Sequence, residues 1–363
     1  MRCPSGADQG SPCVVIIAPA KDAHALVVAK RLEALKAEAV LLDSAEFPAR
    51  WNLSFETGPR GKRFRLRGKG LDLSETRLRG VWWRRPRRHL ASSDVVEAHL
   101  RRFVSLEARA AFEGWLHSLG RRVVNPVAAD HLASHKLLQL QLAQEAGLRI
   151  PQTLATNCPH EARRFSAASE VPTVYKAFTA ASWDLSPTQR LTDDAFVHLE
   201  AVSYAPVIFQ EEIAKVADIR VTIIDGEVFA ISIKCERDGA PIDWRVDPIR
   251  LHEAHALPGH VSTALVDLTR RLGLRFAACD LGLDVDGDYV FFELNPGGQW
   301  LFAEIMAGQE ISWALARALL SGDRGSAPLQ SDKRPAMPLS GGFAGHPPEH
   351  CSALEGEQQA LPA

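Results

Sequence analysis

The chain contains 363 residues, of which 46% are hydrophobic and 24% are charged. Its 42 basic and 44 acidic residues give a net charge of −2, whereas a general nucleic-acid-binding protein normally carries a clear basic excess. No apolar run approaches the ~20 residues that span a bilayer, no secretory signal precedes the first strand, and no Cys-x-x-Cys pair occurs. We therefore expect a cytoplasmic protein with reduced thiols and with neither nucleic-acid nor membrane partners.

The first third of the chain has the pattern of a parallel α/β domain. A buried strand over 14–18, a helix over 22–38 and a strand over 39–43 form a βαβ unit. A further strand is predicted over 81–83. A long helix follows over 94–119, and its apolar residues recur at helical spacing, which gives it one stripe: Val96, Leu100, Phe103, Leu106 and Ala110.

The rest of the chain alternates short strands with helices. A helix with Ser134 as its N-cap and Gly147 just past its end opens this part. A small α+β lobe follows, with a helix over 159–168 and strands over 173–177 and 207–210. The C-terminal part is β-rich: a hairpin over 220–234 with a type I′ turn at Asp225-Gly226, a helix over 260–272, strands over 276–283 and 289–294, and a helix over 304–320.

The segment Phe291-Phe-Glu-Leu-Asn-Pro-Gly-Gly-Gln299 carries the strongest chemical signal. Because side chains alternate along a strand, Glu293 and Asn295 share a face, and Leu294 points into the core. Asp280 lies on the preceding strand and can oppose them. Two carboxylates and a carboxamide form a hard-oxygen site suited to Mg²⁺, although exposed hairpin acids followed by a turn Asn would give the same pattern.

Two lysines and an acidic strand end add to this signal. Lys176 ends an apolar strand, where an ammonium is costly to bury unless an anion such as phosphate pairs with it. Lys136 opens a helix, and either lysine alone could be a solvated end residue. The strand over 207–210 leads into Glu211 and Glu212, which offer backbone groups to adenine and a carboxylate to ribose. A solvated strand end is the alternative.

The order of these elements resembles the ATP-grasp fold, and the details resemble the graspetide (microviridin-type) peptide ligases. Four stretches over residues 14–320 carry the likeness: Val81-Trp-Trp-Arg-Arg-Pro86, Asp218-Ile-Arg-Val-Thr222, Asp243-Trp-Arg245 and Glu293-Leu-Asn-Pro-Gly-Gly-Gln-Trp300. The resemblance implies a mixed α/β (α+β) fold in five parts: a flexible N-terminus (1–13), a pre-ATP-grasp domain (14–126), a lid domain (127–210), a C-terminal domain with the metal site (211–320) and a disordered tail (321–363).

The resemblance also assigns roles to individual residues, with ATP and Mg²⁺ (or Mn²⁺) as cofactors. The phosphates would be held by Lys136 and Lys176. Adenine and ribose would be held by Gln210, Glu211, Glu212, Ile213 and Asp218. The metal ligands would be Asp280, Glu293 and Asn295. Arg220, Arg245 and Lys176 would act in catalysis, and Arg84, Arg85 and Asp243 would face the substrate, with Asp243 as a weak candidate for the general base.

The implied reaction joins side chains of a ribosomal precursor peptide. An Asp or Glu side chain is activated as an acyl phosphate, and a Ser, Thr or Lys side chain attacks it to form an ω-ester or ω-amide ring. The alternatives are a ligase for free amino acids or for glutamate addition, as in glutathione-synthetase-like and RimK-like enzymes, and a non-catalytic nucleotide-binding scaffold. A homodimer is a further expectation. His252 and His255 lack the spacing of a zinc protease and are predicted to lie in a solvated loop or helix end.

Overall fold

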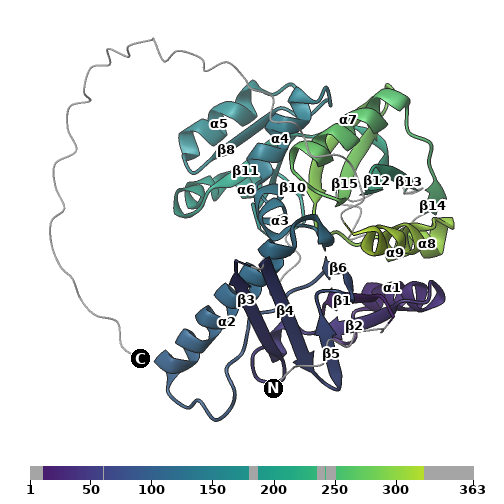
Figure 1. Cartoon of the computed structure of the whole chain (residues 1–363). Helices are drawn as coiled ribbons and strands as arrows, with labels where there is room; N and C mark the ends of the chain where they lie inside the picture. Colours follow the sequence, from purple (N-terminus) through teal and green to yellow (C-terminus); the bar gives the residue numbers. More distant parts are fainter. Residues whose placement is uncertain (1–10, 60, 180–186, 235–241, 243–250, 323–363) are drawn as a thin grey trace, which may run out of the picture. The chain divides into compact units, whose positions relative to one another are not determined.

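The structure begins with the parallel sheet that the βαβ pattern predicts. The computed structural model describes residues 11–59, 61–179, 187–234, 242 and 251–322, all within one compact unit, Met1–Gly325. The sheet order is β2–β1–β6–β7, and β1, which is buried throughout, pairs in parallel with β2 and β6. The elements are β1 (Cys13–Ile17), α1 (Ala23–Ala34), β2 (Glu38–Leu42), β6 (Leu78–Trp83) and β7 (Val123–Val124) (Figure 1).

A second, antiparallel sheet in this part was not predicted. Its strands are β3 (Asn52–Gly58), β4 (Gly61–Gly68) and β5 (Leu71–Ser74), in that order. In β4 the apolar residues Phe64 and Leu66 are buried and alternate with exposed arginines. The ring of Phe64 packs edge-on against Trp115 of the long helix α2 (Ala98–Leu119). The sheet therefore covers the C-terminal half of α2.

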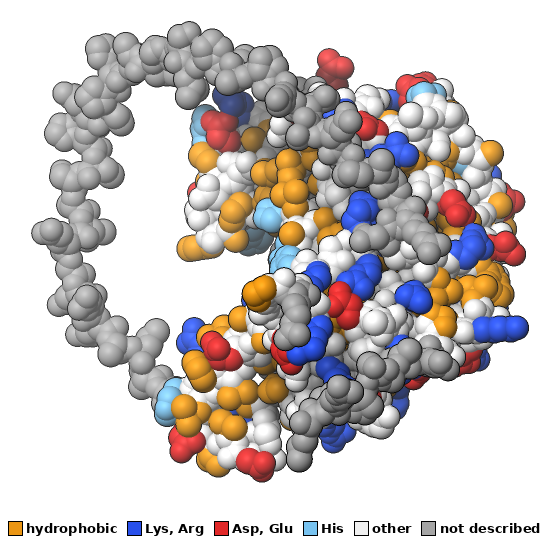
Figure 2. All heavy atoms as spheres, viewed as in Figure 1, with side chains coloured by type: hydrophobic (Ala, Val, Ile, Leu, Met, Phe, Trp, Pro, Cys, Tyr) orange, Lys and Arg blue, Asp and Glu red, His pale blue; other side chains and the backbone are white. Residues whose placement is uncertain are grey.

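The apolar stripe predicted for this helix does not face the core: Val96 precedes α2, and the other four residues of the stripe are exposed. The face that α2 buries is a different one and consists of Ser105, Ala108, Phe112, Trp115, Leu116 and Leu119. Leu100, Phe103 and Leu106 remain 42%, 59% and 55% exposed. Hydrophobic side chains accordingly gather at the surface in the lower left of Figure 2, where α2 lies. The aromatic rings of Phe47, His89 and Phe64 pack against this face at Phe112 and Trp115.

The middle of the chain forms a four-stranded antiparallel sheet with the order β10–β9–β11–β8. Its elements and the helices around it are α3 (Val127–Ala133), α4 (Lys136–Glu145), β8 (Thr153–Thr156), α5 (Pro159–Ala168), β9 (Thr173–Lys176), β10 (Gln189–Arg190), α6 (Asp193–Val197) and β11 (Val207–Glu211). The expectation for Ser134 was wrong. Its hydroxyl donates to the carbonyl of His131 in the preceding helix, and His135 is the N-cap of α4.

The C-terminal part is a five-stranded antiparallel sheet with the order β14–β13–β12–β15–β16. Its elements are β12 (Lys215–Ile224), β13 (Glu227–Lys234), β14 (Leu251–Ala254), α7 (Gly259–Arg271), β15 (Phe276–Asp284), β16 (Tyr289–Asn295), α8 (Leu301–Ala307) and α9 (Ile311–Ser321). Positive φ angles at Asp225 (47°) and Gly226 (94°) confirm the type I′ turn. Side chains on one face pack against α4 and α7, and those on the other pack against α9 and, through it, α1.

Two predictions for this part need correction. The helix expected over 304–320 is two helices, because Gly308 adopts a left-handed conformation (φ 65°) that ends α8. His252 lies in the edge strand β14 rather than in a loop or helix end, and Nε2 of His255 is 2.7 Å from the Tyr289 hydroxyl. Within the described part of the chain, none of the helices combines the length and apolar character needed to cross a membrane.

Candidate active site

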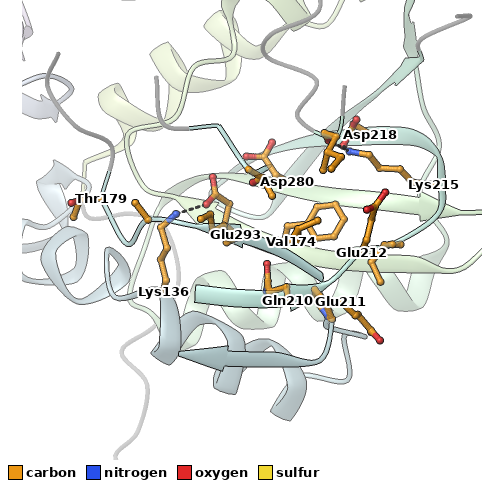
Figure 3. A pocket seen from close by; sticks show the side chains of 17 residues that line it. Lys136, Val174, Thr179, Gln210, Glu211, Glu212, Lys215, Asp218, Asp280 and Glu293 are labelled. Atoms are coloured by element: carbon orange, nitrogen blue, oxygen red, sulfur yellow. Dashed lines mark hydrogen bonds and ion pairs between the residues drawn. The ribbon is translucent and has the colours of Figure 1, made fainter. Parts of the chain in front are cut away.

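The three predicted metal ligands meet on one face of the β15–β16 hairpin. Asp280 lies directly opposite Glu293, and Asn295 lies opposite Ala278. Nδ2 of Asn295 is 3.3 Å from Oδ2 of Asp280 and 3.2 Å from Oε1 of Glu293. Leu294, between them, is buried in the core on the other face. The alternation of side chains along the strand thus places the polar atoms as expected, and Figure 3 shows Asp280 and Glu293 side by side.

Cationic side chains surround the two carboxylates. Arg220 is the neighbour of Asp280 on β12, and its Nη1 donates to both carboxylate oxygens, at 2.7 and 2.8 Å. Lys136, at the start of α4, donates from Nζ to Oε2 of Glu293 at 2.6 Å (Figure 3). Lys176, at the end of β9, lines the same pocket. Five elements, α4, β9, β12, β15 and β16, therefore bring their charges to one place.

The charges around Glu293 decide its protonation state. Burial by itself would raise the pKa of this carboxyl group. The nearby ammonium groups of Lys136 and Lys176, together with hydrogen bonds from Lys136 and Asn295, outweigh burial and hold the pKa of Glu293 well below its ordinary value. The carboxylate is therefore ionised at neutral pH, which is the state a metal ligand requires.

The same pocket extends to the end of β11. Gln210, Glu211, Glu212, Ile213 and Asp218 all line it. The Glu211 side chain accepts a hydrogen bond from the backbone N–H of Gln152 at 3.0 Å and points away from the other labelled acids, so it supports the strand end (Figure 3). Glu212 forms a two-point ion pair with Arg190 of β10, at 2.6 and 2.5 Å. This ion pair links β10, the outer strand of the β10–β9–β11–β8 sheet, to the pocket.

Lys215 is a pocket residue that sequence reasoning missed. Its Nζ donates to the carboxylate of Asp218 and, at 2.8 Å, to the carbonyl of Ile242, and it lies over the ring of Phe292. The available signal was its position at the start of β12, two residues after Ile213 and three before Asp218. Lys136, Lys176 and Lys215 together give the pocket three ammonium groups.

The comparisons with known proteins agree with this geometry. Residues 13–131 match the family model of the MvdD pre-ATP-grasp domain. The macrocyclase MdnC from Microcystis aeruginosa, solved with the precursor peptide MdnA, is 28% identical, with a TM-score of 0.75 over 85% of this chain and 99% of that chain. The macrocyclase MdnB from the same organism is also 28% identical, with a TM-score of 0.71 over 86% of this chain and 100% of that one.

A third solved structure, the ATP-grasp ligase PsnB with minimal precursor, Mg and ADP, is 26% identical, with a TM-score of 0.70 over 85% of this chain and 96% of that chain. No curated protein matches the sequence. The chain is an ATP-grasp ligase that is similar to the graspetide-type macrocyclases. The mixed α/β fold expected from the sequence is therefore confirmed.

The residues of this ligase fit a nucleotide-bound divalent cation. Asp280 and Glu293 would supply oxygen ligands, and turning the Asn295 amide about its last bond would present its oxygen in place of Nδ2. Among the described residues, no group of three or more His, Cys, Asp or Glu side chains is placed to hold a metal ion. Such a sparse protein shell is the arrangement expected for Mg²⁺, which is usually completed by phosphate oxygens and water.

The residues predicted to face the substrate differ in how exposed they are. Arg84 is only 4% exposed, and its Nη1 donates to the carbonyls of Gly297 and Gly298, at 2.6 and 3.3 Å. It is therefore not open to a peptide carboxylate in this structure, contrary to the expectation. The Arg85 side chain is 49% exposed. Asp243 and Arg245 lie outside the described residues.

Proposed function

We propose that this ligase activates Asp or Glu side chains of a ribosomal precursor peptide as acyl phosphates and joins them to Ser, Thr or Lys side chains of the same peptide. The observation that carries this proposal is one pocket lined both by the strand end 210–213 and by the Asp280–Glu293 cluster with its cations. Two of the three solved structures described above contain precursor peptides, and one of these also contains Mg and ADP. The peptide substrate is therefore the best-supported choice.

The positive charges of the pocket would offset the electrostatic repulsion between the two reacting anions. A carboxylate must approach the γ-phosphate of ATP, and two like unit charges at ~4 Å repel by about 4 kcal/mol at an effective dielectric constant near 20. Lys136, Lys176 and Arg220 lie where they would offset this repulsion. Their charges would also stabilise the negative charge that spreads over the transferring phosphoryl oxygens.

The proposed reaction has two steps that balance. First, a peptide carboxylate oxygen attacks the γ-phosphorus, the bond to the bridging oxygen breaks, and ADP leaves. Second, a hydroxyl or amine of the peptide attacks the acyl carbon, phosphate leaves, and the proton of the nucleophile is released. Each ring therefore removes one water from the peptide and produces one ADP and one phosphate.

Asp280, Glu293 and Asn295 would hold the Mg²⁺ ion, which supplies Lewis-acid polarisation of the phosphates when bound. Lys136 and Lys176 would orient the phosphates, and Asp218 with Lys215 would lie toward the nucleoside. The strand end 210–213 would exclude water from the part of the pocket that binds adenine. Because ATP is the co-substrate, we expect the reaction to take place in the cytoplasm. A homodimer stays a prediction that light scattering of the purified protein would test.

Co-expression with a short Ser/Thr- and Asp/Glu-rich peptide encoded next to the gene tests the proposal. We expect intact-mass spectrometry to find peptide that has lost one water per ring, and the purified ligase to release ADP only when peptide is present. Glu293→Gln should abolish both signals, whereas Glu253→Gln, on the exposed edge strand β14, should retain them.

Three other outcomes would contradict the proposal. ADP release with free amino acids or glutamate, and none with peptides, would favour a small-substrate ligase. Nucleotide binding without turnover of any candidate would favour a non-catalytic scaffold. Unchanged activity in the Glu293→Gln variant would place the chemistry elsewhere.

A further inference from the structure

The segment that joins β16 to α8 is held by side chains from distant parts of the chain. This segment, residues 296–300, directly follows Asn295. The carbonyl of Pro296 accepts a hydrogen bond from Asn125 at 3.0 Å, and the carbonyls of Gly297 and Gly298 accept from Arg84. The backbone N–H groups of Trp300 and Leu301 donate to Nε2 of His24, both at 3.2 Å. His24, Arg84 and Asn125 all belong to the pre-ATP-grasp region.

The same segment contacts the catalytic cluster directly. The carbonyl of Gln299 accepts a hydrogen bond from Nη2 of Arg220 at 2.8 Å, while Nη1 of this guanidinium holds Asp280. The backbone of Gly298 lies so close that a Cβ atom there would be 2.7 Å from Nη2 of Arg220 and 2.4 Å from Cβ of Ala278. A shift of this segment would therefore move Arg220, or remove its acceptor.

His24 acts on the segment as a neutral acceptor. Its ring is buried and meets the Trp300 ring edge-on, with the centroids 5.0 Å apart. Two N–H groups donate to Nε2, so this nitrogen carries no proton. Trp300 and Leu301 are the N-cap and first residue of α8, whose first N–H groups have no acceptor within the helix. His24 thus supplies an N-terminal cap to α8 from a helix 276 residues earlier in the chain.

Arg84 acts on the segment as a buried cation. Its Nε lies 3.6 Å from the carboxylate of Asp22, which also caps α1. The guanidinium is thereby fixed between the start of α1 and the carbonyls of Gly297 and Gly298. The pre-ATP-grasp region therefore holds the segment at three points: Asn125 at Pro296, Arg84 beside the Arg220 contact, and His24 at the start of α8.

We infer that Arg84 and His24 are positioning residues that set the place of Arg220, and with it the Asp280–Asn295 cluster, by fixing the segment 296–300. They touch neither the nucleotide pocket lining nor, in this arrangement, the reacting atoms. The pre-ATP-grasp domain is therefore part of the catalytic geometry and not a docking module alone. The expected effect on catalysis rests on the proposed function. The expected effect on the position of the segment 296–300 does not.

Matched variants of the full-length ligase test the inference. Arg84→Met removes the two hydrogen bonds, and Arg79→Met makes the same change at an exposed arginine of β6. His24→Phe keeps a ring against Trp300 but removes the acceptor, and His24→Gln places an acceptor oxygen at the distance of Nε2. The first readout, hydrogen exchange over residues 296–307, needs no activity. The second is the steady-state rate of ADP release with varied ATP and Mg²⁺.

We expect faster exchange over 296–307 in Arg84→Met and His24→Phe, with wild-type exchange in Arg79→Met and near-wild-type exchange in His24→Gln. We expect kcat to fall about 10-fold or more in Arg84→Met, because small misplacements of catalytic groups are costly. In Arg84→Met the KM for ATP should stay within about twofold of the wild-type value, whereas the Mg²⁺ concentration that gives the half-maximal rate should rise. His24→Gln should have most of the activity that His24→Phe loses.

Unchanged hydrogen exchange over 296–307 in Arg84→Met, or unchanged kinetics, would overturn the inference. A rise in KM for ATP as large as the loss of kcat would also overturn it, because it would indicate a general loss of structure in the active site. If the wild-type ligase releases no ADP with any peptide, the proposed function fails on its own. Calorimetric titration with Mg²⁺ and ADP then decides the inference: weaker Mg²⁺ uptake in Arg84→Met supports it, and unchanged uptake overturns it.

Discussion

Arg220 and Asp280 face each other on adjacent strands and form a two-bond ion pair through Nη1, at 2.7 and 2.8 Å. Arg220 is buried and Asp280 is partly buried, so each charge depends on the other for compensation. The pair lies in the middle of the C-terminal sheet, between the loop that carries Gly298 and the strand that carries Glu293. Changes at this pair should therefore affect both folding and activity.

Removing Arg220 alone should destabilise the protein. Arg220→Met leaves the Asp280 carboxylate without its two hydrogen bonds, which costs about 3–5 kcal/mol for a buried pair. Adding Asp280→Asn should return part of that loss, because the carboxylate charge that Arg220 compensated is then gone. Urea unfolding of the two single variants and the double variant measures the coupling. A double variant whose loss is the sum of the two single losses would contradict the pairing.

Gly298 should tolerate no side chain, whereas its neighbour should. A Cβ at Gly298 would lie 2.4 Å from Cβ of Ala278, but one at Gly297 would lie 3.7 Å from the carbonyl of Arg84. We expect Gly298→Ala to lose about 1–3 kcal/mol of stability from overpacking, together with most activity. Gly297→Ala should unfold at nearly the wild-type temperature. Thermal unfolding of both variants checks this, and equal melting temperatures would show that the close approach does not exist.

The two halves of α2 should respond differently to truncation. Phe112→Ala removes a fully buried ring that contacts Phe47 and Trp115, at an expected cost of about 3–5 kcal/mol. Phe103→Ala, on the exposed half of the same helix, should change the free energy of unfolding by about 0.5 kcal/mol or less. Chemical denaturation compares them. A large loss for Phe103→Ala would mean that its surface is covered in solution.

Stability should depend on pH through His24. Burial, assisted by the charge of Arg84, lowers the pKa of His24 from 6.5 to about 4, although Asp22 acts in the opposite direction. The folded state favours the neutral ring, so its contribution is fully present above pH 6.5 and is lost as the pH falls from 6.5 toward 4. This loss is of order 3 kcal/mol at most. Unfolding free energies measured across this range should fall less steeply in His24→Gln than in the wild type.

Much of the candidate site could be predicted because its geometry is local. Strand alternation places Glu293 and Asn295 on one face, and the hairpin turn at Asp286-Gly287 brings Asp280 opposite them. The buried parallel strand over 14–18 and its flanking helix follow from apolar patterning in the same way. These predictions depend only on side-chain period and on short connections, both of which are visible in the sequence.

The missed features depend on contacts between distant segments. Nothing near Arg84 in the sequence indicates that its guanidinium reaches the carbonyls of Gly297 and Gly298 rather than solvent. The apolar spacing in 94–119 predicts a stripe through Leu100, Phe103 and Leu106, but α2 buries a different face, because its partners pack against Phe112 and Trp115. The sheet over 52–74 was missed because its alternating arginines hid the buried Phe64 and Leu66.

The central claim is that Asp280, Glu293 and Asn295 bind a divalent ion beside the nucleotide. Crystals grown with Mn²⁺ and ADP test it most directly, because the anomalous scattering of manganese locates the ion without reference to the protein model. The account predicts one strong anomalous peak in contact with carboxylate oxygens of both Asp280 and Glu293 and with a phosphate oxygen of ADP. Density for ADP elsewhere, or a manganese peak away from these side chains, would contradict it.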